Sequence, residues 1–150
     1  MARIEKSIEI KAPPEKIWEL MAWDRVPEWM DMMKSAEYTS EVSTLEDKLG
    51  VGATAHTIME TAGIKLEGEV ENTECIVNEK TSYRSVSGDL TTIGSTILEP
   101  IEEGTNVKFI TDYELPYSIL GKIIDKLFVH RESEKGVEKS LEKLKNILEK

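Results

Sequence analysis

Hydrophobic residues recur at helical spacing along the last third of the chain, residues 116–150. Most lie three or four positions apart, so at 3.6 residues per turn they share one face of a helix. They are Leu120, Ile123, Ile124, Leu127, Val137, Leu141, Leu144 and Leu148. The pattern predicts one long amphipathic helix, whose apolar stripe must be covered by another part of the chain.

The stripe has one polar gap, between Leu127 and Val137. Helical spacing places His130 and Glu134 on its inward side, four residues apart and therefore neighbours on one face. A polar pair in a buried stripe either borders a cavity or forms a structural hydrogen bond, and the sequence leaves both open. A catalytic acid–base role for this pair is not favoured, because the sequence shows no nucleophile or second base to act with it.

Upstream of this helix the hydrophobic period is two, as in half-buried strands. The clearest stretch alternates Ile64, Leu66 and Val70 with charged residues. Strands are predicted over residues 3–11, 35–42, 53–60, 64–73, 81–86, 90–98 and 107–115. Short turns rich in Gly and Asn separate the last six, which predicts an antiparallel meander with next-neighbour pairing.

Two short helices are predicted between the first two strands, because proline favours the first turn of a helix. Pro14 opens the first and Pro27 the second, and four of the six methionines lie in residues 21–33. Flexible methionine suits a surface that adapts to a partner, although irregular core packing is the alternative. We therefore expect Trp29 and Met33 at the mouth of a cavity.

The order of these elements predicts an α+β protein of one domain, residues 1–150. A sheet of about seven antiparallel strands would wrap around the long C-terminal helix. The sequence contains no internal repeat, low-complexity tract or linker that indicates a second domain.

Three stretches of the sequence resemble the START-like, helix-grip superfamily, which includes the birch-pollen-allergen-like proteins. They are SIEIKAPPEKIW (residues 7–18), VPEW (26–29) and LEPIEEGTNVKFITDYELP (98–116), the last running towards GKIIDKLF. The chain is most similar to the polyketide cyclase/dehydrase and lipid-transport branch. The resemblance implies the helix-grip fold, with a cavity between sheet and helix for an apolar or amphipathic molecule such as a lipid, polyketide or quinone. It implies no particular chemistry.

Residues expected to line that cavity come from the stripe, the second short helix and the strands. Tyr83 and Tyr113 are aromatic strand residues whose buried hydroxyls would need a partner, either a ligand or the backbone. The expected lining is Trp29, Met33, Tyr83, Phe109, Tyr113, Leu120, Ile124, Leu127, His130 and Glu134. The pattern does not determine which way His56 and Arg84 face.

Composition narrows the classes of partner. A net charge of −10 without a Lys/Arg cluster excludes nucleic acid and electrostatic docking to anionic membranes. No segment approaches the ~20 apolar residues of a membrane span, and residues 1–10 lack the apolar core of a signal peptide. The sequence has two His and one Cys, and a zinc site usually needs three or four protein ligands, so we expect no metal and no cofactor. The lone Cys75 indicates a reducing, cytoplasmic location.

Three functional hypotheses remain. The first is a non-catalytic binder or carrier of an apolar or amphipathic small molecule, and it needs no catalytic set. The second is a cyclase- or dehydratase-like enzyme. The third is a protein-interaction module of the chaperone-partner or toxin-like kind, for which the methionine-rich residues 21–33 would supply an exposed apolar patch.

Overall fold

The computed structural model describes residues 1–121 and 125–150. Seven strands and two short helical turns precede a long C-terminal helix, with one further short helix in the chain before β3 and another after β7. The elements are β1 (Ala2–Ile10), α1 (Pro14–Glu19), η1 (Val26–Glu28), β2 (Met33–Tyr38), α2 (Leu45–Leu49), β3 (Thr54–Thr61), β4 (Ile64–Ile76), β5 (Lys80–Gly88), β6 (Thr91–Ile101), β7 (Gly104–Glu114), α3 (Tyr117–Leu120) and α4 (Lys126–Leu148).

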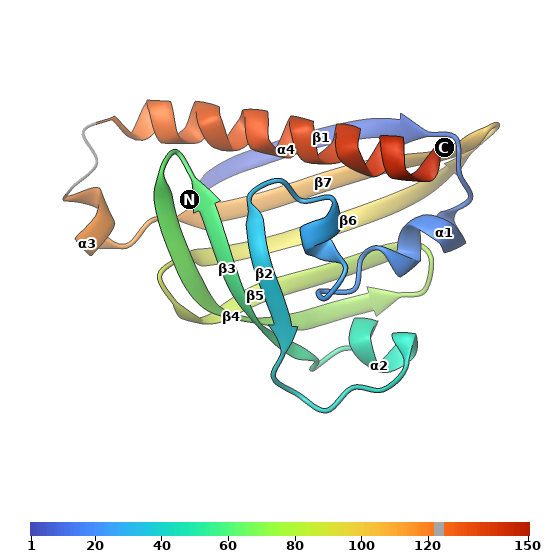
Figure 1. Ribbon diagram of the computed structural model, residues 1–150, viewed down its shortest axis with the longest axis horizontal. Helices are drawn as coiled ribbons and strands as arrows, with labels where there is room; N and C mark the ends of the chain where they lie inside the picture. The colour runs from blue at the N-terminus through green and yellow to red at the C-terminus, as the bar shows by residue number, and fades with distance from the viewer. Residues whose placement is uncertain (122–124) are drawn as a thin grey trace.

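The strands form one antiparallel sheet in the order β1-β7-β6-β5-β4-β3-β2, which curls round beneath α4 (Figure 1). The predicted α+β architecture, with seven strands wrapped around the C-terminal helix, is confirmed. Next-neighbour pairing holds from β2 to β7. The exception is β1, which pairs with β7, Ala2 opposite Tyr113 and Ile10 opposite Thr105.

The two short helices after β1 are also confirmed, the second as a single 3₁₀ turn around Pro27. Helix α2 was not predicted, although the sequence carries its signal. Thr44 Oγ1 accepts a hydrogen bond from Asp47 N, and the Asp47 carboxylate accepts one from Thr44 N, which is a capping box. Hydrogen bonds from Ser43 and Thr44 hold the pKa of Asp47 below its usual value.

The long C-terminal helix begins later in the chain than the hydrophobic stripe predicts. Helix α4 starts at Lys126, because the Asp125 carboxylate caps it by accepting hydrogen bonds from Leu127 N and Phe128 N. The expected lining residue Ile124 lies outside the described residues.

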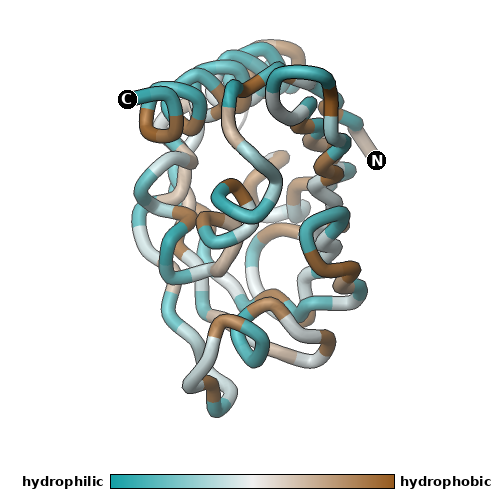
Figure 2. Tube along the Cα trace, turned by 90° about the vertical axis from the view of Figure 1, so that its right-hand side faces the viewer, coloured by the Kyte–Doolittle hydropathy of each residue, from teal (hydrophilic) through white to brown (hydrophobic). Residues whose placement is uncertain are grey.

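The inward face of α4 differs from the predicted stripe at its N-terminal end. Its buried residues are Val129, Ser133, Val137, Ser140, Leu141 and Leu144. The prediction that Leu127 faces the sheet is wrong, since its side chain is 55% exposed. At about 100° per residue, Leu127 lies about 80° round the helix from Val137, on the side away from Val129. In Figure 2 the tube of α4, across the top, is mainly hydrophilic in colour with separate hydrophobic patches.

Residues 29–33, the methionine segment, pack beneath α4. Asp31 N donates to Ser140 Oγ at 2.8 Å, and Glu60 N donates to Met32 O at 2.8 Å, so the segment is tied to α4 and to β3. Gly136 permits this close approach, because a Cβ there would lie 2.7 Å from Met32 Sδ. Of the two alternatives for the methionines, the structure shows core packing and not an exposed patch, since no Met in residues 21–33 is more than 9% exposed.

Candidate functional site

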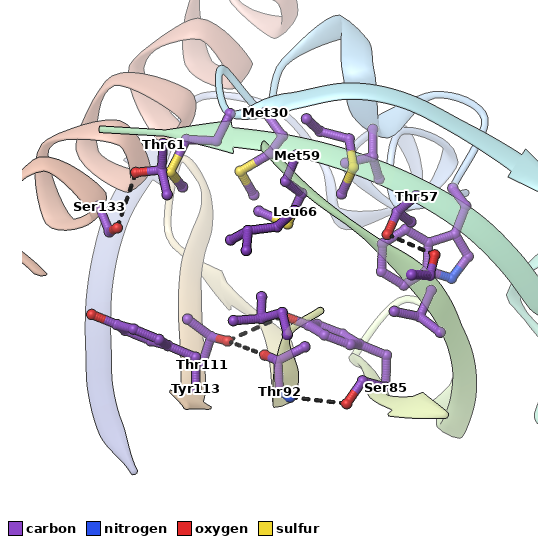
Figure 3. A pocket seen from close by; sticks show the side chains of 18 of the residues that line it. Met30, Thr57, Met59, Thr61, Leu66, Ser85, Thr92, Thr111, Tyr113 and Ser133 are labelled. Carbon is purple, nitrogen blue, oxygen red and sulfur yellow. Dashed lines mark hydrogen bonds between the residues drawn. The ribbon is translucent and has the colours of Figure 1, made fainter. Parts of the chain in front are cut away.

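A cavity lies between the inner face of the sheet, the methionine segment and α4 (Figure 3). The volume open to the centre of a water molecule is about 130 Å³, room for several waters. Helix α4 contributes Val129, Ser133 and Val137 to its lining. The cavity therefore lies beneath the N-terminal half of the helix.

One wall of the cavity is apolar and adaptable. Met30 of the methionine segment, Met59 of β3 and Leu66 of β4 project into the space together (Figure 3). Trp29 also lines the cavity, and its Nε1 donates to Leu20 O at 2.8 Å. Because methionine side chains change rotamer at little cost, this wall suits apolar groups of varied shape.

A network of hydrogen bonds lies at the end of the cavity beside α2. Trp23 Nε1 donates to Asn72 Oδ1 at 2.8 Å, and Asn72 Nδ2 donates to Lys48 O and Gly50 O. The Tyr38 hydroxyl accepts from Trp23 N and donates to Lys48 O, and burial raises its pKa to about 12. Asn72 borders the cavity, but these bonds give it a structural role.

A small apolar cluster lies at the opposite end. Leu66, Leu115 and Val129 are buried there, and Leu90 of the β5–β6 turn and Leu120 of α3 pack against them. Leu120 thus covers this end from outside and does not line the cavity.

The face of the cavity opposite the methionines carries hydroxyl groups. We call Tyr83, Ser85, Thr92 and Thr111, from β5, β6 and β7, the hydroxyl floor (Figure 3 labels the last three). Thr111 Oγ1 lies 3.2 Å from Tyr83 Oη and 3.1 Å from Thr92 Oγ1. Thr92 Oγ1 donates to Asp112 O at 3.0 Å, and Thr92 N donates to Ser85 Oγ at 2.9 Å.

Tyr83 reaches across β6 because the residue beneath its ring is glycine. A Cβ at Gly94 would lie 2.6 Å from Tyr83 Oη and 2.7 Å from two ring carbons, so a larger residue would displace the ring. The ring also meets Trp23 edge-on, with 5.3 Å between centroids. Burial raises the pKa of the Tyr83 hydroxyl, which therefore stays protonated at neutral pH.

Strand β6 inverts the usual polarity of a half-buried strand. Its inward side chains are Thr92, Gly94, Thr96 and Leu98, whereas Ile93 on the outer face is 50% exposed. Thr92 and its neighbour Ser85 were not predicted, because the alternating pattern assigns the isoleucines of β6, and not its threonines, to the core. Thr111 had a signal, since it shares the inward face of β7 with Phe109 and Tyr113.

The polar gap of α4 forms a chain at the rim of the cavity. Tyr113 lines the cavity with its ring, which stacks on His130 with 5.9 Å between centroids, and its hydroxyl lies 2.8 Å from His130 Nδ1. His130 Nε2 lies 3.5 Å from a Glu134 carboxylate oxygen, and the other oxygen lies 3.5 Å from Lys6 Nζ. Burial, and then the charge of Glu134, raises the pKa of Tyr113.

The structure brings together half of the residues expected to line the cavity. Trp29, Met33, Tyr83, Phe109 and Tyr113 lie in its lining. His130 and Glu134 lie at the rim, Leu120 outside one end and Leu127 on the surface.

The two residues whose facing was open both lie on the outer side of the sheet. His56 Nε2 is 2.8 Å from a Glu67 carboxylate oxygen, and Arg84 donates to Glu71, with all four side chains partly exposed. Neither His56 nor Arg84 reaches the cavity.

Charged side chains contribute little to the cavity. Among the described residues that line it there is no Lys, Arg, His, Asp or Cys. Two glutamates border it, and their carboxylates are bonded to other side chains, Glu67 to His56 and Glu69 to Thr39. Within residues 1–121 and 125–150, no three metal-ligating side chains gather into a site.

Comparison with known proteins agrees with this geometry. The family model described as polyketide cyclase / dehydrase and lipid transport matches residues 1–149. Among curated proteins, none matches the sequence.

Solved structures match over nearly the whole chain. A START superfamily protein from Mycobacterium smegmatis is 13% identical with a TM-score of 0.77, covering 98% of this chain and 97% of its own. TTHA0849 from Thermus thermophilus is 22% identical (TM-score 0.76; 97% and 95% covered), and major latex-like protein 151 from Panax ginseng is 12% identical (0.72; 98% and 97%). At these identities the likeness shows a shared fold, and the helix-grip prediction is confirmed.

Proposed function

We propose that this chain, which belongs to the polyketide cyclase / dehydrase and lipid transport family, is a single cytoplasmic domain that binds an amphipathic, mostly apolar small molecule in the cavity beneath α4. The observation that carries the proposal is the two-sided lining. Methionine and leucine side chains form one wall and hydroxyl groups the opposite floor. Pockets that bury the apolar body of a ligand and orient it by a few polar groups have this composition.

Binding without turnover is preferred to a cyclase or dehydratase reaction. General acid–base catalysis needs a titratable side chain within hydrogen-bond reach of the substrate. In the described part of the lining, tyrosine hydroxyls and two bonded glutamates are the titratable groups. The hydroxyl of Tyr113 is directed to His130 at the rim, and that of Tyr83 is bonded to Thr111.

A role as a protein-interaction module is not supported, because the methionines that would have formed its exposed apolar patch are buried. In the described part of the chain, no helix is long and apolar enough to cross a bilayer. Net charge, at −10, also gives anionic lipid surfaces no electrostatic attraction. The proposed partner is therefore a small molecule.

The test is to fill the cavity from the helix. Ser133 is 6% exposed and faces the cavity from α4, so Ser133→Phe should occupy the ligand space. Lys135→Phe is the matched control, because the Lys135 side chain is 73% exposed on the same helix. The probe is the neutral fluorophore N-phenyl-1-naphthylamine, and circular dichroism checks that both variants keep the fold.

We expect Ser133→Phe to weaken probe binding at least about tenfold and Lys135→Phe to leave it within about twofold. Equal binding by the two variants would place the probe outside the cavity and refute the proposal. If Ser133→Phe alone loses probe binding, mass spectrometry of the protein purified under non-denaturing conditions from its native host would identify the natural ligand.

A further inference from the structure

We propose that the cavity selects an uncharged ligand bearing a hydroxyl group, which binds the hydroxyl floor, and that it discriminates against carboxylates. This inference rests on the proposed binding function and specifies its ligand class. Two independent observations support it: the direction of the hydrogen bonds in the floor, and the charges around the cavity.

The protons of the hydroxyl floor run in one direction. Each hydroxyl carries one proton, and that of Thr92 is donated to the carbonyl oxygen of Asp112. In the contact between Thr111 and Thr92, Thr111 is therefore the donor. By the same reasoning Tyr83 donates to Thr111. The chain Tyr83, Thr111, Thr92 has used all three of its protons and ends at the backbone.

The direction of these hydrogen bonds determines which donor and acceptor sites of the hydroxyl floor remain for a ligand. Tyr83 Oη donates within the chain and accepts no bond from another described residue, so it retains an acceptor site. Ser85 Oγ accepts from Thr92 N, a bond that uses a lone pair and leaves the proton of Ser85 to donate. The floor thus offers one acceptor and one donor. A ligand hydroxyl matches either, whereas a carboxylate matches only the donor.

Charge points to the same ligand class. The described lining contains no Lys, Arg or His, and the carboxylates of the two bordering glutamates, Glu67 and Glu69, are bonded to His56 and Thr39, which lie outside the lining. A buried carboxylate without a cation is strongly disfavoured, because it loses its hydration and gains no ion pair. A neutral hydroxyl group loses far less hydration free energy on burial, and a hydrogen bond to Ser85 or Tyr83 compensates for that loss.

The experiment uses three ligands with one naphthalene body: 2-naphthalenemethanol, 2-methylnaphthalene and 2-naphthoate. Each is measured at pH 7 by displacement of N-phenyl-1-naphthylamine, whose own affinity is determined for every variant. For the wild-type chain we expect the alcohol to bind at least about tenfold more tightly than the carboxylate.

Removal of the floor groups supplies the second arm. The double variant Tyr83→Phe, Ser85→Ala keeps the ring over Gly94 and deletes both groups left for a ligand. Binding of the alcohol should weaken by about tenfold, and that of 2-methylnaphthalene should change by less than about twofold. The matched control is Tyr117→Phe, the same change at a tyrosine that is 92% exposed on α3, which should alter neither.

Each outcome decides a separate claim. Naphthoate binding as tightly as the alcohol would overturn the discrimination against carboxylates. Equal losses for the alcohol and the hydrocarbon in the double variant would overturn the role of the floor. In both cases the binding function would survive, since the hydrocarbon still binds. If none of the three ligands displaces the probe, the inference fails, whereas the proposed function fails only if Ser133→Phe and Lys135→Phe bind the probe equally.

Discussion

The two halves of α4 have the same helical geometry, but the N-terminal half covers the cavity and the C-terminal half covers a filled core. From Ser140 to its C-terminal end the helix packs on a filled core, and Leu141 and Leu144 are 3% and 0% exposed. From Lys126 to Ser133 it spans the cavity, and Leu127 and Phe128 point into solvent. One helix therefore anchors the fold at one end and covers the cavity, the proposed binding site, at the other.

The difference shows how a small domain keeps an internal space without losing its structure. Cavity-lining contacts are weaker than core contacts, because side chains beside empty space lack partner atoms on one side. Stability must then come from the filled end, where α4 packs over β1. Changes at the two ends should accordingly separate, with stability governed by one and binding by the other.

The largest effect should come from Leu144→Ala, at the filled end. Leu144 is fully buried, so its truncation should lower the free energy of unfolding by ~2–5 kcal/mol through lost burial and a new void. Urea unfolding followed by circular dichroism measures the change. A loss under ~0.5 kcal/mol would mean that the C-terminal half is not packed as described, and the comparison between the halves would fail.

A smaller effect is expected at the cavity floor. Gly94→Ala would push the Tyr83 ring off β6 and separate it from Trp23, which should cost ~1–3 kcal/mol and change the near-ultraviolet circular dichroism. Gly121→Ala is the matched control, since a Cβ at Gly121 would meet Tyr117 O at an ordinary 3.5 Å. If both variants kept the wild-type near-ultraviolet spectrum, the close approach of Tyr83 to Gly94 would be excluded.

The smallest effect should be that of Leu127→Ala, at the end of α4 that covers the cavity. The substitution matches Leu144→Ala chemically, but Leu127 is 55% exposed, so the free energy of unfolding should change by less than ~0.5 kcal/mol. The two variants measured side by side give the contrast directly. A destabilisation of Leu127→Ala comparable to that of Leu144→Ala would show that the stripe predicted from the sequence is correct after all.

Most of the fold was predictable because local patterns determine it. Period-two alternation located all seven strands, and short turns gave the pairing from β2 to β7. The β1–β7 pairing has no local signal, since Ala2 and Tyr113 are far apart in sequence. The inward face of α4 was predicted correctly at Leu141 and Leu144, where the helix covers a filled core, and at Val137, the last α4 residue in the cavity lining. It was wrong at Leu127, near the N-terminal end of the helix, where the side chain is 55% exposed.

The site was less predictable, because a cavity relaxes the rule on which pattern analysis depends. Large aromatic residues such as Trp29 and Phe109 were found, since apolar residues at inward positions are the expected signal. Thr92 and Ser85 were missed because polar side chains beside a cavity occupy positions that a filled core would give to Val or Ile. Gly94 was missed for a related reason, since its role depends on Tyr83 of the neighbouring strand.

The pairing of β1 with β7 also sets an order for folding during synthesis. About 100 residues separate the two strands, so at ~5–20 residues per second the first strand waits roughly 5–20 s for its partner. During that time β2 to β6 can assemble from neighbouring hairpins, while β1 remains an unpaired strand. Its charged residues, Arg3, Glu5, Lys6 and Glu9, reduce its tendency to pair with another nascent chain. Strand β1 is thus made first but is among the last strands to join the sheet. Helix α4 is made only after the sheet that it covers.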